Sequence, residues 1–159
     1  MILEFTAEEM EKIDRIKSKY PDKKAALMPV LWMAQKKWGW ISGDVQETIA
    51  DTLGLSLSHV EGVASFYTMY FKKPMGKYHI QVCTNVSCML LGGEEIFMHV
   101  AGKLGIGNNE RTADGHFSLE EVECMGACGG APMIAINEDY YENVDIQKVD
   151  ELIESLRNK

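Results

Sequence analysis

The stretch 78-YHIQVCTNVSC-88 changes from one structural pattern to another at its first cysteine. In its first half, Tyr78–Cys83, apolar Ile80 and Val82 alternate with polar His79 and Gln81, which predicts a β-strand. Thr84-Asn85 interrupts that alternation. From Ser87 to Leu104 the apolar residues recur at helical spacing. Gly92-Gly93 lowers helix stability within this range, which indicates either a break there or a close approach by another backbone. We therefore expect Cys88 at or just inside a helix N-terminus, where amide dipoles favour an anionic thiolate.

The chain has four cysteines, which form two close pairs. Cys83 and Cys88 have four residues between them, and after 35 further residues Cys124 and Cys128 have three between them. Thiolate sulfur is the ligand that iron-sulfur clusters and structural zinc sites select, and four thiolates complete either kind of site. We expect all four cysteines to bind one metal group.

The spacing within the pairs distinguishes between kinds of cysteine site. Four-cysteine zinc sites commonly use C-x2-C pairs, thioredoxin-type disulfides use one C-x-x-C, and plant-type 2Fe-2S proteins place C-x2-C soon after C-x4-C. None of these arrangements occurs here. Residues 123–132, ECMGACGGAP, are mostly small, and such a loop lets backbone N–H groups approach the sulfurs. A distinct 2Fe-2S arrangement fits best, while zinc and a redox disulfide remain open on spacing alone.

Length and composition indicate an ordinary globular protein. The chain has 159 residues, of which 46% are hydrophobic, enough for one domain or for one domain with a small appendage. Its longest apolar run, residues 25–34, is far shorter than the roughly 20 residues needed to span a bilayer. Residues 1–5, MILEF, lack the basic start of a signal peptide. We therefore expect a cytoplasmic protein without direct membrane insertion, in which reduced thiols suit metal binding.

The chain is strongly acidic, with a formal net charge of -8 and a pI near 5.0. Nucleic-acid binding needs a basic face that neutralises phosphates, so we expect no nucleic-acid partner. The simplest interpretation of the acidic surface is that it is solvated. The alternative is a docking face for a basic patch on a partner protein.

The first 70 residues carry the start and stop signals of four helices. Capping boxes at Thr6-x-x-Glu9 and Ser58-x-x-Glu61 predict the starts of the first and the fourth helix. Pro29 is expected in the first turn of the second helix, because a proline further inside would kink that helix. The expected ranges are about 6–19, 24–38, 43–53 and 58–67, and Gly39 is expected to end the second helix as its C-cap.

This helical part has no catalytic composition, since it lacks a phosphate-binding loop and its His59 stands alone. Trp32 and Trp38 are expected in its core, whereas Trp40 is the better candidate for a partner contact. Proline and glycine in residues 71–76, FKKPMG, mark a linker. We therefore divide the chain into a helical module, residues 1–73, and a second domain, residues 74–159.

The second domain is expected to be α/β. Asp114-Gly115 is a hairpin signal, so its flanks should pair as antiparallel strands, and the outgoing strand over 117–123 leads into Cys124. The later elements are expected to be strands at 133–136 and 140–144 and a helix at 145–157. The full order of strand, helix, three strands and helix matches a thioredoxin-like arrangement, a mixed sheet with flanking helices and with both cysteine pairs in loops at one edge.

Three segments of the second domain carry a resemblance to a known family: residues 82–88 (VCTNVSC), the Asp114-Gly115 hairpin with 117–122 (FSLEEV), and 123–128 (ECMGAC). Parts of the helical module agree as well, at 34–41 and 62–67. Together they resemble the 24 kDa, 2Fe-2S subunit of respiratory complex I, the NADH:quinone oxidoreductase, in its bacterial type. That protein is similar to thioredoxin-like 2Fe-2S ferredoxins. The resemblance covers nearly the whole chain.

The resemblance implies a thioredoxin-like domain that holds one 2Fe-2S cluster, with Cys83 and Cys88 on one iron and Cys124 and Cys128 on the other. It implies a flavoprotein partner that binds FMN and NADH and is contacted mainly through the helical module. The implied role is single-electron transfer with that flavin, so no catalytic residue is expected in this chain. The implied location is cytoplasmic and peripheral to the inner membrane, within a larger complex.

Several alternatives stay open at this point. Related subunits of NAD-linked hydrogenases and formate dehydrogenases are similar to the same family. A free thioredoxin-like ferredoxin would have no evident use for the helical module. Two further alternatives lack a cluster: a zinc-stabilised interaction module with no redox role, and a thiol oxidoreductase that works through one cysteine pair.

Overall fold

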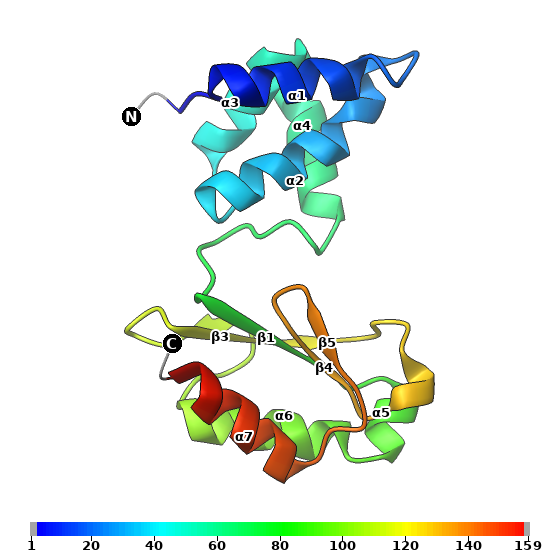
Figure 1. Cartoon of the computed structure of the whole chain (residues 1–159), viewed down its shortest axis with the longest axis vertical. Coiled ribbons are helices and arrows are strands. Elements are labelled where there is room, and N and C mark those ends of the chain that lie inside the picture. Colours follow the sequence, from blue (N-terminus) through cyan, green and yellow to red (C-terminus); the bar gives the residue numbers. More distant parts are fainter. Residues whose placement is uncertain (1–2, 158–159) are drawn as a thin grey trace. The chain divides into compact units, whose positions relative to one another are not determined.

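The computed structural model describes residues 3–157 and contains two compact units, which divide between Pro74 and Met75 (Figure 1). Each unit has its own cluster of buried hydrophobic side chains. The first unit is helical, and the second is a mixed sheet with helices, which confirms the expected α/β fold class.

Over residues 3–74, the described part of the first unit, there are four α-helices and one short 3-10 helix. They are α1 (Ala7–Lys17), η1 (Lys23–Ala26), α2 (Leu27–Trp38), α3 (Gly43–Leu53) and α4 (Leu57–Phe66). The predicted capping box at the start of α1 is confirmed: the Glu9 N–H donates to Thr6 Oγ1 at 3.3 Å, and the Thr6 N–H donates to Glu9 Oε2 at 2.7 Å. The start of α1 is therefore determined by residues only three positions apart.

The start of the second helix differs from the prediction. Residues 24–26 belong to the 3-10 helix η1, and α2 begins only at Leu27. Proline has no N–H, so Pro29 cannot make the α-helical hydrogen bond to the carbonyl of Ala25. It is instead the third residue of α2, where an N–H would have no partner within the helix. The expected first-turn position of Pro29 is thus confirmed, and Gly39 ends the helix with a φ of 82°.

The predicted start of α4 at Ser58 is wrong by two residues. Ser56 is the N-cap, and its Oγ accepts the His59 N–H at 3.3 Å, while the Ser58 hydroxyl contacts Ser56 Oγ. Because the helix begins at Leu57, the Val60 N–H donates to the Ser56 carbonyl at 3.2 Å. A helix that began two residues later would lack this hydrogen bond. Tyr67, which was expected on the helix, is its C-cap.

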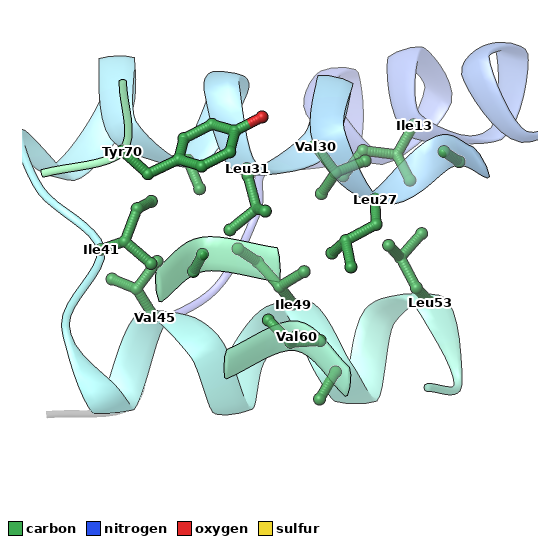
Figure 2. Close-up of a cluster of buried hydrophobic side chains, with 14 residues drawn as sticks. Ile13, Leu27, Val30, Leu31, Ile41, Val45, Ile49, Leu53, Val60 and Tyr70 are labelled. Carbon is green, nitrogen blue, oxygen red and sulfur yellow. The ribbon is translucent and has the colours of Figure 1, made fainter. Parts of the chain in front are cut away.

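The core of the first unit draws one or more side chains from each α-helix (Figure 2). Leu31, Ile49 and Val60 are fully buried there. Trp32 and Trp38, which were expected in the core, are partly buried and pack against this cluster. Tyr70 follows α4 and is also buried, and its hydroxyl donates to the Met28 carbonyl at 3.0 Å. That bond ties the chain after α4 to the start of α2.

The second unit contains a five-stranded sheet in the order β2-β3-β1-β4-β5. The strands are β1 (Tyr78–Cys83), β2 (Glu110–Arg111), β3 (Phe117–Val122), β4 (Ile134–Ile136) and β5 (Asp139–Tyr141). The central pair β1 and β3 is parallel, and the other pairs are antiparallel. The hairpin predicted at Asp114-Gly115 is confirmed, because β2 and β3 pair on either side of it.

The strand predicted at 140–144 is shorter than expected, since β5 ends at Tyr141. Asn143 has a positive φ of 49°, and its N–H donates to the Gly130 carbonyl at 2.7 Å. The next N–H, of Val144, donates to the Pro132 carbonyl. The chain leaves the sheet at this point because its backbone finds partners in the loop before β4.

Helices α6 (Gly93–Leu104) and α7 (Ile146–Arg157) cover one face of the sheet (Figure 1). Their buried side chains, such as Val100 and Ile153, pack against Ile80 and Leu119 of the two central strands. The short helix α5 (Val86–Leu90) precedes α6. The break between them is at Gly92, whose φ is 96°, as the two adjacent glycines had indicated. No helix within residues 3–157 has the length and apolarity required to cross a bilayer.

Candidate metal centre

The four cysteines follow the ends of the two central strands. Cys83 is the last residue of β1, and Cys124 lies two residues beyond β3. Since β1 and β3 are parallel and Cys83 is in register with Val122, both strands lead to the same edge of the sheet. Cys88 is the third residue of α5, close to its N-terminus as predicted, and Cys128 begins a short 3-10 helix, η2 (Cys128–Gly130).

The two cysteine pairs differ in their exposure to solvent. Cys83 is 3% and Cys88 2% exposed, and both belong to a small buried cluster with Ala131 and Met133. Cys124 and Cys128 are exposed. A metal group held by all four would therefore have a buried side and a solvent-facing side.

Backbone groups near the sulfurs are already oriented toward them. The Gly126 N–H donates to Cys124 Sγ at 3.3 Å, a contact that stabilises a thiolate. On the buried side, Cys83 Sγ lies 3.7 Å from the Glu123 carbonyl oxygen, to which the thiol can donate. The Gly126 contact agrees with the expectation that the loop over 123–132 lets backbone N–H groups approach the sulfurs, whereas the Glu123 contact involves a carbonyl oxygen.

The Cys88 thiol is buried in the same cluster as the Cys83 thiol, and both burial and this neighbour change its pKa. Burial raises the pKa of the Cys88 thiol, and the hydrogen-bonded Cys83 thiol raises it further. The charge of Cys128 adds a smaller increase. Cys83 and Cys88 lie together in one buried cluster, and Ala127, the residue before Cys128, packs against that cluster.

The four thiols fit the requirements of a 2Fe-2S group in number, in ligand type and in their common location at one sheet edge. Among residues 3–157, however, no three Cys, His, Asp or Glu side chains already lie close enough together to hold a metal ion. The assignment of all four cysteines as ligands therefore remains a prediction.

A buried polar network on β1 and β3 was not anticipated from the sequence. His79 is 3% exposed, with Nδ1 2.8 Å from Ser118 Oγ and Nε2 3.0 Å from Glu120 Oε2. Gln81 Nε2 donates to the same Glu120 oxygen at 2.9 Å. The available signal was the set of polar residues at alternate positions of both strands, which share the sheet face with Cys83. The network satisfies the polar groups of this face.

A second unanticipated feature is the contact of Gly93 with the backbone of two cysteines. A Cβ atom at Gly93 would lie 2.6 Å from the Cys83 carbonyl oxygen and 2.9 Å from that of Cys88. The pair Gly92-Gly93 had indicated either a helix break or a close approach by another backbone. Both occur, one at each glycine.

Comparisons with known proteins show which sequences this chain is similar to. The family profile of the thioredoxin-like 2Fe-2S ferredoxins matches residues 13–157. A subunit of the NADH-quinone oxidoreductase of Rhizobium meliloti (strain 1021) is 44% identical over 147 residues, which are 92% of this chain and 88% of the relative. The corresponding subunit of Rickettsia bellii (strain RML369-C) is 41% identical over 97% of this chain and 94% of its own length. That of Mycobacterium tuberculosis (strain ATCC 25618 / H37Rv) is 39% identical over 88% of this chain, and the match covers 56% of that protein.

A solved structure shares the fold. The chain matches a NAD+-reducing NiFe hydrogenase in its H2-reduced state with a TM-score of 0.72 and 22% sequence identity. The match covers 82% of this chain but only 22% of the hydrogenase chain, so this chain spans about a fifth of that length. Since the profile match and the 39–44% identities extend over most of its length, the chain belongs to the thioredoxin-like 2Fe-2S ferredoxin family, together with these NADH-quinone oxidoreductase subunits.

Proposed function

We propose that this chain is an electron-transfer subunit of an NADH:quinone oxidoreductase and carries one 2Fe-2S cluster. The observation that carries the proposal is the position of four cysteines at the common edge of β1 and β3 in a chain 44% identical to a subunit of such an oxidoreductase. The chain takes part in an oxidoreductase without a catalytic residue of its own. Its cluster exchanges single electrons with the flavin of a partner protein.

The proposed ligands are Cys83 and Cys88 for one iron and Cys124 and Cys128 for the other. When bound, the cluster supplies one-electron redox chemistry. The protein contributes the surroundings: the buried pair excludes water on one side, and the Gly126 N–H stabilises negative charge at Cys124. Added charge is better solvated at the exposed pair, so this side suits the approach of an electron-exchange partner.

The proposed partner is a flavoprotein subunit that binds FMN and NADH, contacted mainly through the helical module of residues 1–73. Supporting this role, Phe66, Tyr67 and Met69 are exposed near the end of α4, with Phe66 78% accessible. Exposed aromatic and methionine side chains are enriched in protein interfaces. The redox domain is then residues 74–159. We propose a cytoplasmic location, peripheral to the inner membrane within the larger complex.

Metal and sulfide analysis of the purified chain tests the cofactor. The proposal predicts about two iron atoms and about two acid-labile sulfides per chain. One zinc ion without sulfide would favour the zinc-stabilised interaction module, and disulfide-reductase activity of a cluster-free chain would favour the thiol oxidoreductase. Either result would reject the redox-cluster function.

Co-purification from the native source tests the assembly. A partner that contains FMN and oxidises NADH, in a complex that reduces quinone, is the expected result. The fold shared with the NAD+-reducing hydrogenase makes a hydrogenase partner the main alternative, and a formate dehydrogenase partner is the other. A monomer without any partner would indicate a free ferredoxin.

A further inference from the structure

Gly93 occupies the point where α6 meets the backbone of two cysteines. It is the first residue of α6 and is buried. An added Cβ would lie 2.6 Å from the Cys83 carbonyl oxygen and 2.9 Å from the Cys88 carbonyl oxygen, distances that real Cβ atoms essentially never show. Both obstructing atoms belong to the backbone, so a change of side-chain rotamer cannot relieve the contact.

The elements around this contact differ in how many packing contacts and hydrogen bonds fix their positions. Helix α6 is anchored to the sheet core by Ile96 and Val100, which are 4% and 0% exposed. Cys83 is paired with β3 in β1, and its N–H also donates to the Met133 carbonyl at 3.3 Å. Helix α5, which carries Cys88, has only five residues. A methyl group at position 93 would therefore displace Cys88 more than α6 or Cys83.

We infer that Gly93 is a positioning residue for the ligand pair Cys83 and Cys88. The inference rests on the proposed function, because it concerns how these two cysteines share one iron. Because Gly93 has no Cβ, the start of α6 packs directly against the carbonyl groups of Cys83 and Cys88. This contact fixes the positions of both cysteines and so the separation of their two sulfurs. Residues that orient metal ligands typically change metal affinity roughly 10- to 100-fold when they are altered.

The chain provides a matched control within the same helix. Gly102 also lies in α6, and a Cβ there would meet no atom within 4 Å. Gly93→Ala and Gly102→Ala make the same chemical change in the same helix, and only the first adds an atom next to the cysteines. A difference between the two variants therefore reports on the ligand contact and not on the helix propensity of alanine.

The experiment compares three full-length chains loaded with iron and sulfide: the wild type, Gly93→Ala and Gly102→Ala. The measurements are iron and sulfide content, electron paramagnetic resonance of the reduced chains, reduction potential, and the rate of iron loss to a chelator. Gly102→Ala should match the wild type in all of them. Gly93→Ala should show altered g-values, a shifted potential and roughly 10-fold faster iron loss.

Each other outcome has a definite meaning. A Gly93→Ala chain with the spectrum, potential and iron-loss rate of Gly102→Ala would overturn the inference and leave the proposed function intact. Far-UV circular dichroism is measured on all three chains, and a Gly93→Ala chain that has lost its helical signal would assign Gly93 a general packing role, which also overturns the inference. A wild-type chain that cannot hold iron and sulfide would overturn the proposed function, and the inference with it.

Discussion

Cys124 and Cys128 are exposed, whereas Cys83 and Cys88 lie in a small buried cluster with Met133. The two pairs thus offer a metal group different environments, one solvated and one largely apolar. Hydrogen bonding and solvent exposure both tune the potential of iron-sulfur clusters, so the pairs are not equivalent even though all four ligands have the same chemistry. Of the exposed pair, Cys124 is the thiol that accepts a backbone N–H, from Gly126.

A serine at position 124 tests one of the two exposed proposed ligands. We expect Cys124→Ser to lose the visible absorbance of the cluster and most of its iron, because alkoxide oxygen is a poorer match than thiolate for this kind of cluster. Absorbance spectra and iron analysis of the purified variant provide the measurement. Met125→Leu, a change in the same loop that removes no proposed ligand, is the control and should keep its colour. Unchanged colour and paramagnetism in Cys124→Ser would show that this cysteine is not a required ligand.

At the scale of single elements, α4 is started by Ser56 and not by Ser58. Ser56 Oγ accepts the His59 N–H at 3.3 Å as the N-cap side chain, and the same N–H also donates to the Ser56 carbonyl at 3.1 Å. The nearby Ser58 hydroxyl donates to Ser56 Oγ at 3.3 Å. Two serines two residues apart therefore make unequal contributions to the stability of one helix.

We expect Ser56→Ala to lower the free energy of unfolding of the first unit by about 1 kcal/mol, the usual cost of losing an N-cap side chain. Ser58→Ala is the matched control and should change it by less than about 0.5 kcal/mol. Urea unfolding followed by tryptophan fluorescence measures both variants. Equal losses in the two variants, or a larger loss for Ser58→Ala, would contradict the capping role of Ser56.

The contact between α6 and α7 has an electrostatic component. His99 Nε2 lies 2.7 Å from Asp150 Oδ1, and Lys103 Nζ lies 2.9 Å from the same oxygen. The His99 hydrogen bond, followed by that of Lys103, lowers the pKa of the Asp150 carboxyl below its ordinary value of 3.8. A lowered carboxyl pKa contributes stability that is present above the ordinary pKa and is lost as the pH falls through the folded-state pKa.

Asp150→Asn should therefore be less stable than the wild type at pH 7, and the difference should shrink as the pH falls to 3.8 and below. The effect is expected to be small because solvent screens these groups. Urea midpoints of both chains, measured by circular dichroism from pH 7 to pH 3, give the comparison. Glu151→Gln, at the adjacent exposed position, is the control. A difference that stays constant with pH would contradict a role for the ionised carboxylate.

At the scale of the whole molecule, the two units bury separate hydrophobic cores, and their functional features are equally separate. All four cysteines lie in the second unit, beyond Met75, and all three tryptophans lie in the first. Tryptophan fluorescence thus reports on the helical unit alone. A cluster, by contrast, would bind and stabilise only the folded second unit.

Removal of iron with a chelator should therefore lower the stability of the second unit and leave that of the first unit unchanged. We expect it to lower the thermal midpoint of the second unit by several degrees, because a bound group that favours the folded state raises its stability by mass action. The tryptophan fluorescence midpoint should stay within error. Fluorescence and far-UV circular dichroism recorded during the same heating scan measure the two transitions. If the fluorescence midpoint falls by the same amount, the units unfold as one.

The sequence by itself determined several features that depend on neighbouring residues, although the N-cap of α4 was misplaced from Ser56 to Ser58. The capping box at Thr6, the helix stop at Gly39 and the hairpin at Asp114-Gly115 were all predicted, because the groups that form them are at most a few positions apart. The strand ending at Cys83 was predicted for the same reason. The spacing of the four cysteines and the family resemblance supplied the candidate site.

Only the tertiary structure decided which groups meet across the chain. It placed Cys83 and Cys88 in a buried cluster and left Cys124 exposed, and it ended β5 at Tyr141 through bonds to the loop before β4. It also joined His79 of β1 to Glu120 of β3, about forty residues apart. These features depend on which backbone and side-chain groups find partners when distant segments pack, and that is a property of the folded chain and not of any local pattern.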